Sequence, residues 1–173
     1  MRKRITFYMA VVLLLLLPAC GAQTPQEAIS GALGIDVSNC DLVSASDDHG
    51  GFHGDGITFV ELSCADSGVL DQIREDNNWK VFPLDRTVQA LVYGVTERIG
   101  TEESGIMISQ TGPYLTDDDN NPLVPEIQEG YYRLIDRHTE AGESDILSRH
   151  SFNFTLALYD TENDTLYFCK MDT

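Results

Sequence analysis

Residues 152–170 read FNFTLALYDTENDTLYFCK, and this stretch decides the fold. Apolar side chains recur at every second position from Phe152 to Leu158, which is the period of a β-strand with one buried face. Residues 161–164 (TEND) have the composition of a turn, and residues 165–170 are again rich in β-forming side chains. The stretch therefore predicts an antiparallel β-hairpin near the C-terminus.

Segments upstream of this hairpin predict further strands. Residues 131–136 are β-prone, and residues 40–46 and 57–64 form two strand-like segments. Between these two segments, residues 47–56 hold four glycines, which indicates a long turn. We therefore expect a sheet assembled from hairpins.

Three segments predict short helices. Thr24 and Glu27 fit a capping box for a first helix, which Gly34 ends. A second helix is expected over residues 66–76, and a third from the capping residue Asp85 to about Gly94, with Val95 continuing its apolar spacing. Together with the strands, these helices predict the α+β class: an antiparallel sheet built from hairpins, with two or three short helices packed on one face.

Residues 96–128 show no sustained periodicity and contain several glycines and prolines. We interpret them as a long loop with one short strand at residues 106–108, although so long a loop is uncommon in a compact domain. Residues 20–173 have the length of one ordinary domain, and we find no internal repeat or linker.

The N-terminus has the three-part layout of an export signal. Arg2, Lys3 and Arg4 precede an apolar run of 13 residues, 5–17, and a small residue, Ala19, follows. A transmembrane anchor is the alternative, but the run is shorter than the roughly 18–20 residues that span a bilayer. We therefore predict that residues 1–19 are a signal peptide.

Leu17-Pro18-Ala19-Cys20 resembles the lipobox of bacterial lipoproteins. The resemblance implies cleavage before Cys20 and a diacylglycerol group on its sulfur, which places the mature chain at the extracytoplasmic face of the cell membrane. Two acyl chains suffice for stable anchoring. Ordinary secretory cleavage slightly downstream of Cys20 is the alternative.

The mature chain is strongly acidic. Removing the signal takes three of the 11 Lys and Arg residues and leaves 8 against 28 Asp and Glu, a net charge of −20. Such a surface repels phosphates, so nucleic acid is excluded as a partner, and a basic protein or a cation is the charged partner that it favours. A surface that is acidic only for solubility is the alternative.

The turn at residues 47–56 is the one candidate metal site. It places Asp47, His49, His53 and Asp55 within nine positions, and imidazole and carboxylate groups are ligands of zinc and manganese. No Glu stands beside the histidines as a base. An ordinary turn, in which Asp and Gly satisfy the backbone geometry, is the alternative.

Three cysteines follow Cys20, and an exported protein can form disulfides. Cys40 and Cys64 are equally distant from residue 52, the centre of the glycine-rich turn. A hairpin without a bulge would place them opposite each other, at a Cα separation of about 4.5 Å. We therefore predict a Cys40–Cys64 disulfide and a buried free thiol at Cys169.

Three segments, residues 49–56 (HGGFHGDG), 131–138 (YYRLIDRH) and 152–160 (FNFTLALYD), are similar to segments of small uncharacterised lipoproteins and membrane-tethered proteins of Gram-positive bacteria. The resemblance covers most of the mature chain. It implies an exported, membrane-anchored protein and no particular activity.

These observations favour a non-catalytic lipoprotein that binds a partner at the cell envelope. No Gly-x-Ser-x-Gly nucleophile motif and no phosphate-binding glycine loop with a lysine occur, and the sequence requires no cofactor. Two alternatives stay open. One is a metal-dependent hydrolase that uses His49 and His53, and the other is an acidic inhibitor or immunity-like protein directed against a basic partner.

Overall fold

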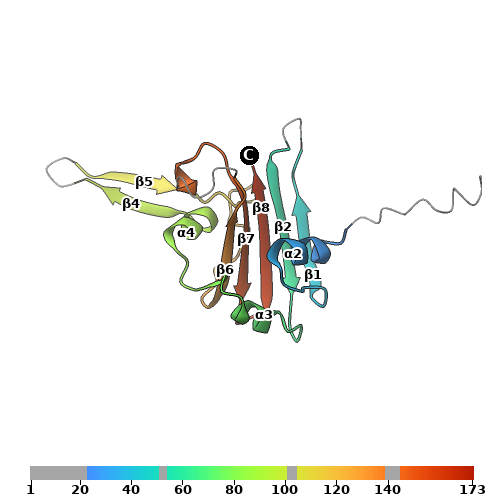
Figure 1. The fold of residues 1–173 in the computed structure, drawn as a ribbon. Coiled ribbons are helices and arrows are strands. Elements are labelled where there is room, and N and C mark those ends of the chain that lie inside the picture. The colour runs from blue at the N-terminus through green and yellow to red at the C-terminus, as the bar shows by residue number, and fades with distance from the viewer. Residues whose placement is uncertain (1–22, 51–53, 101–104, 139–144) are drawn as a thin grey trace, which may run out of the picture.

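The computed structural model describes residues 23–50, 54–100, 105–138 and 145–173. Within these residues the chain forms a six-stranded antiparallel sheet in the order β1-β2-β8-β7-β6-β3 and a separate two-stranded sheet of β4 and β5 (Figure 1). The strands are β1 (Asp41–Asp47), β2 (Gly56–Ser63), β3 (Lys80–Val81), β4 (Val95–Ile99), β5 (Met107–Thr111), β6 (Gly130–Asp136), β7 (Asn153–Asp160) and β8 (Thr165–Asp172).

The hairpin predicted from residues 152–170 is present as β7 and β8. The two strands pair from Asp160 opposite Thr165 to Asn153 opposite Asp172 without interruption. Tyr159 Oη donates to Asp164 Oδ1 (3.0 Å), and the Asp160 carboxylate accepts from the backbone N–H of Glu162 (2.8 Å), so polar side chains satisfy the turn. These two strands form the centre of the large sheet.

The helices are short, and two of them begin at the capping residues expected from the sequence. In α2 (Pro25–Leu33), Thr24 Oγ1 accepts from Glu27 N–H (3.2 Å) and Glu27 Oε2 accepts from Thr24 N–H (2.9 Å), which completes the capping box. In α4 (Arg86–Val92), Asp85 Oδ1 accepts from Val88 N–H (3.0 Å). The remaining helices are α3 (Val69–Glu75) and the 3₁₀ helix η1 (Ile146–Ser148).

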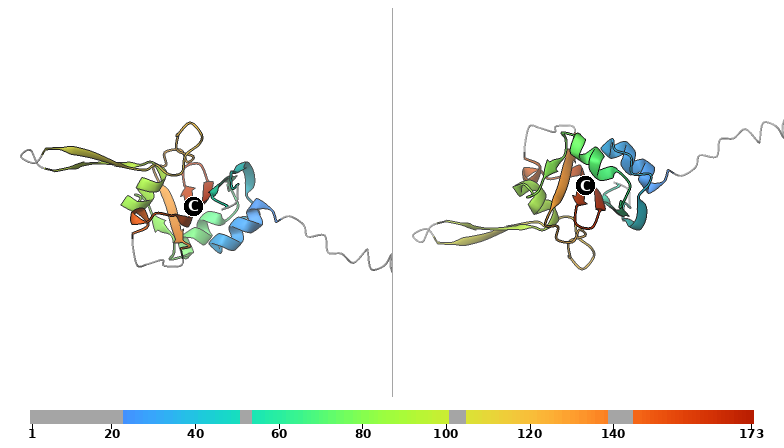
Figure 2. Two further views of the ribbon diagram at one scale, coloured as in Figure 1. Left: turned by 90° about the horizontal axis from the view of Figure 1, so that it is seen from above. Right: turned by 90° about the horizontal axis from the view of Figure 1, so that it is seen from below.

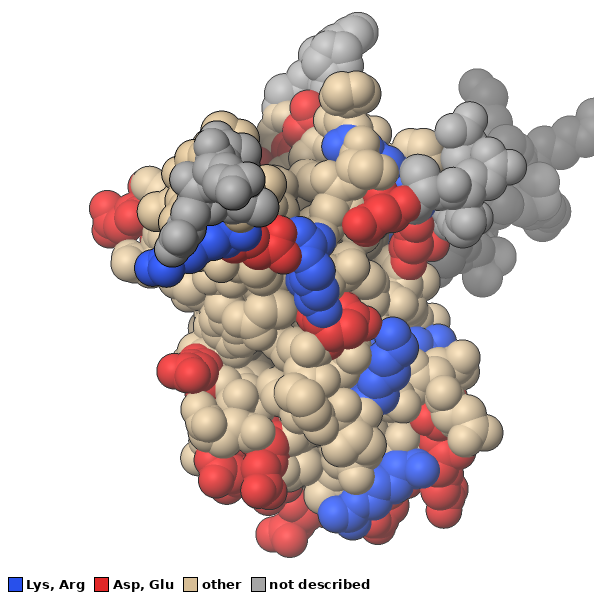
Figure 3. All heavy atoms as spheres, turned by 90° about the vertical axis from the view of Figure 1, so that its left-hand side faces the viewer, with Lys and Arg blue, Asp and Glu red and all other residues tan. Residues whose placement is uncertain are grey.

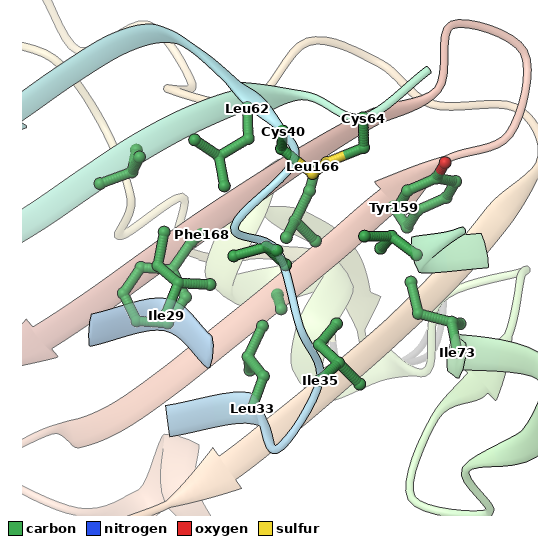
Figure 4. Close-up of a cluster of buried hydrophobic side chains, with 14 of the residues drawn as sticks. Ile29, Leu33, Ile35, Cys40, Leu62, Cys64, Ile73, Tyr159, Leu166 and Phe168 are labelled. Atoms are coloured by element: carbon green, nitrogen blue, oxygen red, sulfur yellow. A yellow bond between two sulfur atoms is a disulfide. The ribbon is translucent and has the colours of Figure 1, made fainter. Parts of the chain in front are cut away.

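One face of the large sheet is covered by α2 and α3. Ile29 and Leu33 of α2 and Ile73 of α3 pack against apolar side chains of β2, β7 and β8, which include Leu166 and Phe168 (Figure 4). Two short helices on one face agree with the prediction, and the fold is of the α+β class.

The opposite face is buried as well, which the sequence analysis did not predict. Val88, Leu91 and Val92 of α4 pack there with Leu156 and Leu158 of β7. The two views in Figure 2 show α4 on one side of β6 and α2 with α3 on the other. Because β7 is covered on both faces, nearly every one of its side chains is buried.

The interpretation of residues 96–128 as a loop is wrong for its first half. Val95, expected on the apolar face of a helix, begins β4, because the helix ends at Val92 and Gly94 adopts a positive φ of 80°. The short strand expected at residues 106–108 is longer and pairs with β4 from Val95 opposite Thr111 to Ile99 opposite Met107. This hairpin projects from the body as an arm (Figure 1).

Candidate functional site

The predicted metal-binding loop is organised by a hydrogen-bond network around His49. The ring Nδ1 lies 2.7 Å from Asp47 Oδ1 at the end of β1, and Nε2 lies 3.3 Å from Asp172 Oδ2 at the end of β8. The backbone N–H of His49 donates to the same Asp47 oxygen (3.0 Å). These bonds from the His49 backbone and ring lower the pKa of Asp47.

Asp172 joins this loop to two basic side chains, Lys170 on its own strand and Arg137 after β6. Its carboxylate accepts from Arg137 Nη2 (2.6 Å) and lies 2.9 Å from Lys170 Nζ. Burial opposes ionisation here, but the hydrogen bonds and charges of Lys170 and Arg137 outweigh it and lower the pKa of Asp172. Both ring nitrogens of His49 therefore face ionised carboxylates.

The structure brings together two of the four predicted metal ligands, Asp47 and His49, and adds Asp172, which the sequence did not single out. Asp55 contributes its backbone carbonyl to the turn, where it accepts from Gly50 N–H (3.4 Å), and His53 lies outside the described residues. Within the described part of the chain, no group of three or more His, Cys, Asp or Glu side chains is placed to bind a metal. The full four-residue site stays a prediction.

The disulfide expected from the sequence is present at the base of this loop. Cys40 and Cys64 are bonded, with their Cα atoms 4.4 Å apart, and both side chains are buried beside Leu62 and Leu166 (Figure 4). A β-bulge does occur in β1, between Leu42 and Ser44, but it lies on the loop side of the disulfide. The register beside the cysteines is therefore the one that places them opposite each other.

The arm formed by β4 and β5 is the main candidate for a contact surface. Four large apolar side chains near its end are exposed to solvent: Ile99 (49%), Ile106 (58%), Met107 (68%) and Ile108 (72%). Ile99 pairs with Met107 on one face of the ribbon, and Ile108 lies on the other face opposite Arg98. Both faces of the end of the arm therefore carry exposed apolar side chains.

The root of the arm is closely packed. The backbone N–H groups of Tyr114 and Leu115 both donate to the carbonyl of Leu91 in α4 (2.9 and 3.0 Å). Gly112 adopts a positive φ of 70°, and a Cβ at this position would collide with the carbonyl oxygen of Ala90. The root is thus fixed against α4 by contacts that only glycine allows.

A charged pair also holds the first strand of the arm. Arg86 in α4 donates from Nε and Nη2 to the two carboxylate oxygens of Glu97, at 2.9 Å each. Such a bidentate pair fixes direction as well as distance, so the arm leaves the body at a defined angle.

A groove opens beside this root. It has a volume of about 690 Å³, which falls within the range of about 300–1,000 Å³ of ligand pockets. Tyr93, the residue after α4, donates from Oη to the carbonyl of Pro125 (2.6 Å), and burial raises its pKa. The lining mixes polar side chains with aromatic, aliphatic and proline ones: Phe82, Pro83, Leu84, Gln89, Tyr93, Pro122, Val124, Pro125, Glu126, Ile127 and Gln128.

Charges of both signs occur on the side of the molecule toward which the arm projects. Figure 3 shows Lys and Arg side chains interspersed there with Asp and Glu side chains and separated by uncharged surface. This face therefore offers contacts of mixed charge, although the chain as a whole is strongly acidic.

Comparison with family models, curated proteins and solved structures finds no match to this chain. Among the described residues, no helix has both the length and the apolar character needed to cross a bilayer. The function of this chain is therefore inferred from its own contacts and exposed surfaces.

Neither the arm nor the groove could be predicted from the sequence pattern. Residues 95–99 (VTERI) include three β-branched side chains, and residues 106–108 (IMI) are wholly apolar, so a strand signal was present. It was obscured because Val95 also continues the helical spacing of Val88, Leu91 and Val92. The groove is built from segments distant in sequence and left no local signal.

Proposed function

We propose that this chain is a non-catalytic lipoprotein, anchored to the extracytoplasmic face of the cell membrane through Cys20, which binds a protein partner through the β4–β5 arm. The observation that carries the proposal is the exposed apolar end of the arm, on a strand pair that projects away from the body. An exposed apolar cluster on a projecting element is typical of a surface that another molecule covers.

The position of the arm suits a membrane-anchored protein. The first described residue, Gln23, is three residues from Cys20, a distance of at most about 10–11 Å of extended chain. Figures 1 and 2 show the start of α2 and the arm on opposite sides of the body. When the α2 side is next to the bilayer, the arm points away from it, toward partners rather than toward lipid.

The energetics of the arm also favour a bound state. A two-stranded ribbon is marginally stable in water unless it packs against something else. Complete burial of one Ile or Met side chain contributes roughly 1.5–3 kcal/mol. The four apolar side chains at the end of the arm are between 49% and 72% exposed, so each is already partly buried. A partner that covers them therefore gains part of this burial free energy from each side chain.

Charge sets the long-range attraction of the body of the protein, separately from what covers the apolar end of the arm. With a net charge of −20 after signal removal, the protein attracts basic surfaces and repels phosphate polymers. The alternative hydrolase function is not carried further, since both ring nitrogens of His49 face carboxylates rather than an open metal site.

One experiment tests the arm. The full-length protein and a variant with Ile106→Lys and Ile108→Lys are cross-linked in cells of the source organism, and the captured proteins are compared. We expect the variant to lose proteins that the wild type captures. The control is Val43→Lys, which places one lysine at a side chain 57% exposed on β1, near the other end of the chain's sheet order from the arm's side. Equal capture by all three proteins would contradict a role for the arm.

A second experiment tests the anchor. Cys20→Ser removes the sulfur that would carry the lipid, so we expect the protein to leave the membrane fraction and appear as precursor or in the medium. Membrane retention of the Cys20→Ser protein with its signal removed would contradict lipid anchoring at this residue.

A further inference from the structure

We propose that the arm binds a second copy of this chain, and that two copies exchange arms so that the end of each arm lies in the groove beside the root of the other. The inference rests on the proposed function, in which the arm is the contact surface, and adds the identity of the partner. The exposed arm of each copy would then be covered by the groove of the other, and each groove would be filled by an arm.

The apolar part of the groove suits the end of the arm, and its polar part suits the charged side chain beside that end. Aliphatic and thioether side chains, such as Ile99, Met107 and Ile108, pack well against aromatic rings and prolines. Phe82 and Pro125 line the groove, which is large enough for several side chains of this size. The side chains of Ile99, Met107 and Ile108 have no hydrogen-bonding group that would need a polar partner deep in the groove.

The placement of the groove makes the exchange reciprocal. Tyr93, which lines the groove, is separated from the first residue of β4 by Gly94 alone. Each strand of the arm has five residues and extends about 17 Å. When the arms of two copies lie side by side and antiparallel, the end of one arm is next to the root of the other arm. The groove lies beside that root. A contact of this kind is isologous and closes after two copies.

The backbone of the arm supports the same arrangement. The small sheet consists of β4 and β5 alone, so each strand has one edge without a neighbouring strand in the described structure. Antiparallel arms from two copies can pair these edges and form a four-stranded ribbon. The ribbon would thereby exceed the two strands that are marginal in isolation.

Charges at the two ends are complementary. Arg98, near the end of the arm, is exposed, and the exposed Glu126 lines the groove. In the exchanged pair each Arg98 approaches the Glu126 of the other copy. The two acidic bodies repel each other, so added salt should strengthen the self-association, whereas salt weakens binding to a basic partner.

The test is a charge swap in the full-length protein, purified in detergent, with its association measured by analytical ultracentrifugation. We expect wild type to form dimers, and Arg98→Glu and Glu126→Arg each to weaken dimerisation about tenfold, the factor that 1.4 kcal/mol produces. The double variant, in which the two charges are exchanged, should recover most of the wild-type affinity. Val43→Lys should leave it unchanged. A monomeric wild type, or a double variant no better than the single variants, would overturn the proposal.

A second measurement guards against variants that fail to fold. Cysteines are introduced at Ile108 in the arm and at Gln128 in the groove, and intermolecular disulfides are scored in intact cells. The double variant should form covalent dimers, and each single variant should form at least tenfold fewer. If no dimer forms and the Ile106→Lys, Ile108→Lys variant still captures fewer proteins in cells than the wild type, the proposed function stands and the partner is a different protein. If no dimer forms and this variant captures the same proteins as the wild type, both proposals fail.

Discussion

Asp172, the second residue from the C-terminus, connects three segments that are far apart in the sequence. It bonds to Arg137 after β6, to Lys170 within β8 and to His49 beyond β1, and its side chain is 22% exposed. A single carboxylate therefore bonds the end of β8 to residues that follow β1 on one side of the sheet and β6 on the other. Its ionisation is linked to the stability of the fold.

The residue-scale prediction concerns pH. Because the pKa of Asp172 is lowered in the folded protein, the stability that it contributes is present above the ordinary carboxyl pKa and is lost as pH falls through the lower, folded value. Asp172→Asn should cost about 1–3 kcal/mol at pH 7, as expected for hydrogen bonds to a charged group. It should also flatten the loss of stability in acid.

Urea unfolding at pH 7 and at pH 3 checks this prediction. Asp41→Asn, at an exposed position of β1, is the control and should change the unfolding free energy little at either pH. If Asp172→Asn unfolds with the wild-type pH profile, the linkage assigned to this carboxylate is absent.

Individual cysteines could be assigned from the sequence because their positions encode register. Cys40 and Cys64 are equally spaced about one turn, and this symmetry survives because the bulge at Val43 lies between the disulfide and the loop. Cys169 is a buried free thiol, as predicted, and burial raises its pKa to about 12. By contrast, nothing near His49 in the sequence indicates Asp172 as its partner, because the contact spans 123 positions.

At the scale of the element, the disulfide closes the β1–β2 hairpin at its base. It joins residues 24 positions apart, and a loop of this size is worth about 3 kcal/mol in the chain-entropy model. Replacing both cysteines by serine should therefore lower Tm by about 6–12 °C in a domain of this size.

Differential scanning calorimetry measures this effect. The single variant Cys40→Ser should lose nearly as much stability as the double variant, since either change opens the same loop. An unchanged Tm in both variants would show that the disulfide does not restrict the unfolded chain.

The root of the arm gives a second prediction at this scale. Gly112→Ala should destabilise the protein by about 2–4 kcal/mol, because the new methyl group meets the carbonyl oxygen of Ala90 while the backbone has a positive φ. Gly54→Ala is the matched control: its φ of 71° is nearly the same, but no atom lies within 4 Å of the added Cβ. It should cost only the backbone strain, about 1–2 kcal/mol.

Chemical denaturation of both variants separates crowding from strain. Equal losses at Gly112 and Gly54 would mean that the root tolerates a side chain and that the arm is not fixed there.

Elements with one strong local signal were predictable, and those with two competing signals were not. The β7–β8 hairpin has a clear two-residue period and a turn, and the α2 capping box lies within four consecutive residues. The start of the arm has both a helical and a strand-like reading, which only the break at Gly94 resolves. The second apolar face of the sheet was overlooked because its members are divided among α4, residues 115–127 and the strands.

At the scale of the whole molecule, charge repulsion opposes the compact state. Residues 20–173 carry a net charge of −20, and the Debye length falls from about 30 Å at 0.01 M salt to about 8 Å at 0.15 M. We expect this increase in sodium chloride to raise Tm by about 2–4 °C, the shift that about 1 kcal/mol produces at this size.

A partly neutralised variant tests whether charge is the cause. Asp41→Asn, Glu75→Gln and Asp118→Asn remove three exposed acids, so the combined variant should respond less to salt than the wild type does. The same salt response in both proteins would point to general ion effects instead of self-repulsion.

The strand order has a consequence for when the chain can fold. β8, the last strand in the sequence, lies between β2 and β7, and β2 pairs with it across more than 100 positions. Until residues 165–172 are available, the sheet lacks the strand that joins β2 to β7. β1 and β2 then form an isolated hairpin, which is marginal alone. Formation of the six-stranded sheet therefore depends on pairing between residues more than 100 positions apart, which is a slow, non-local step of folding.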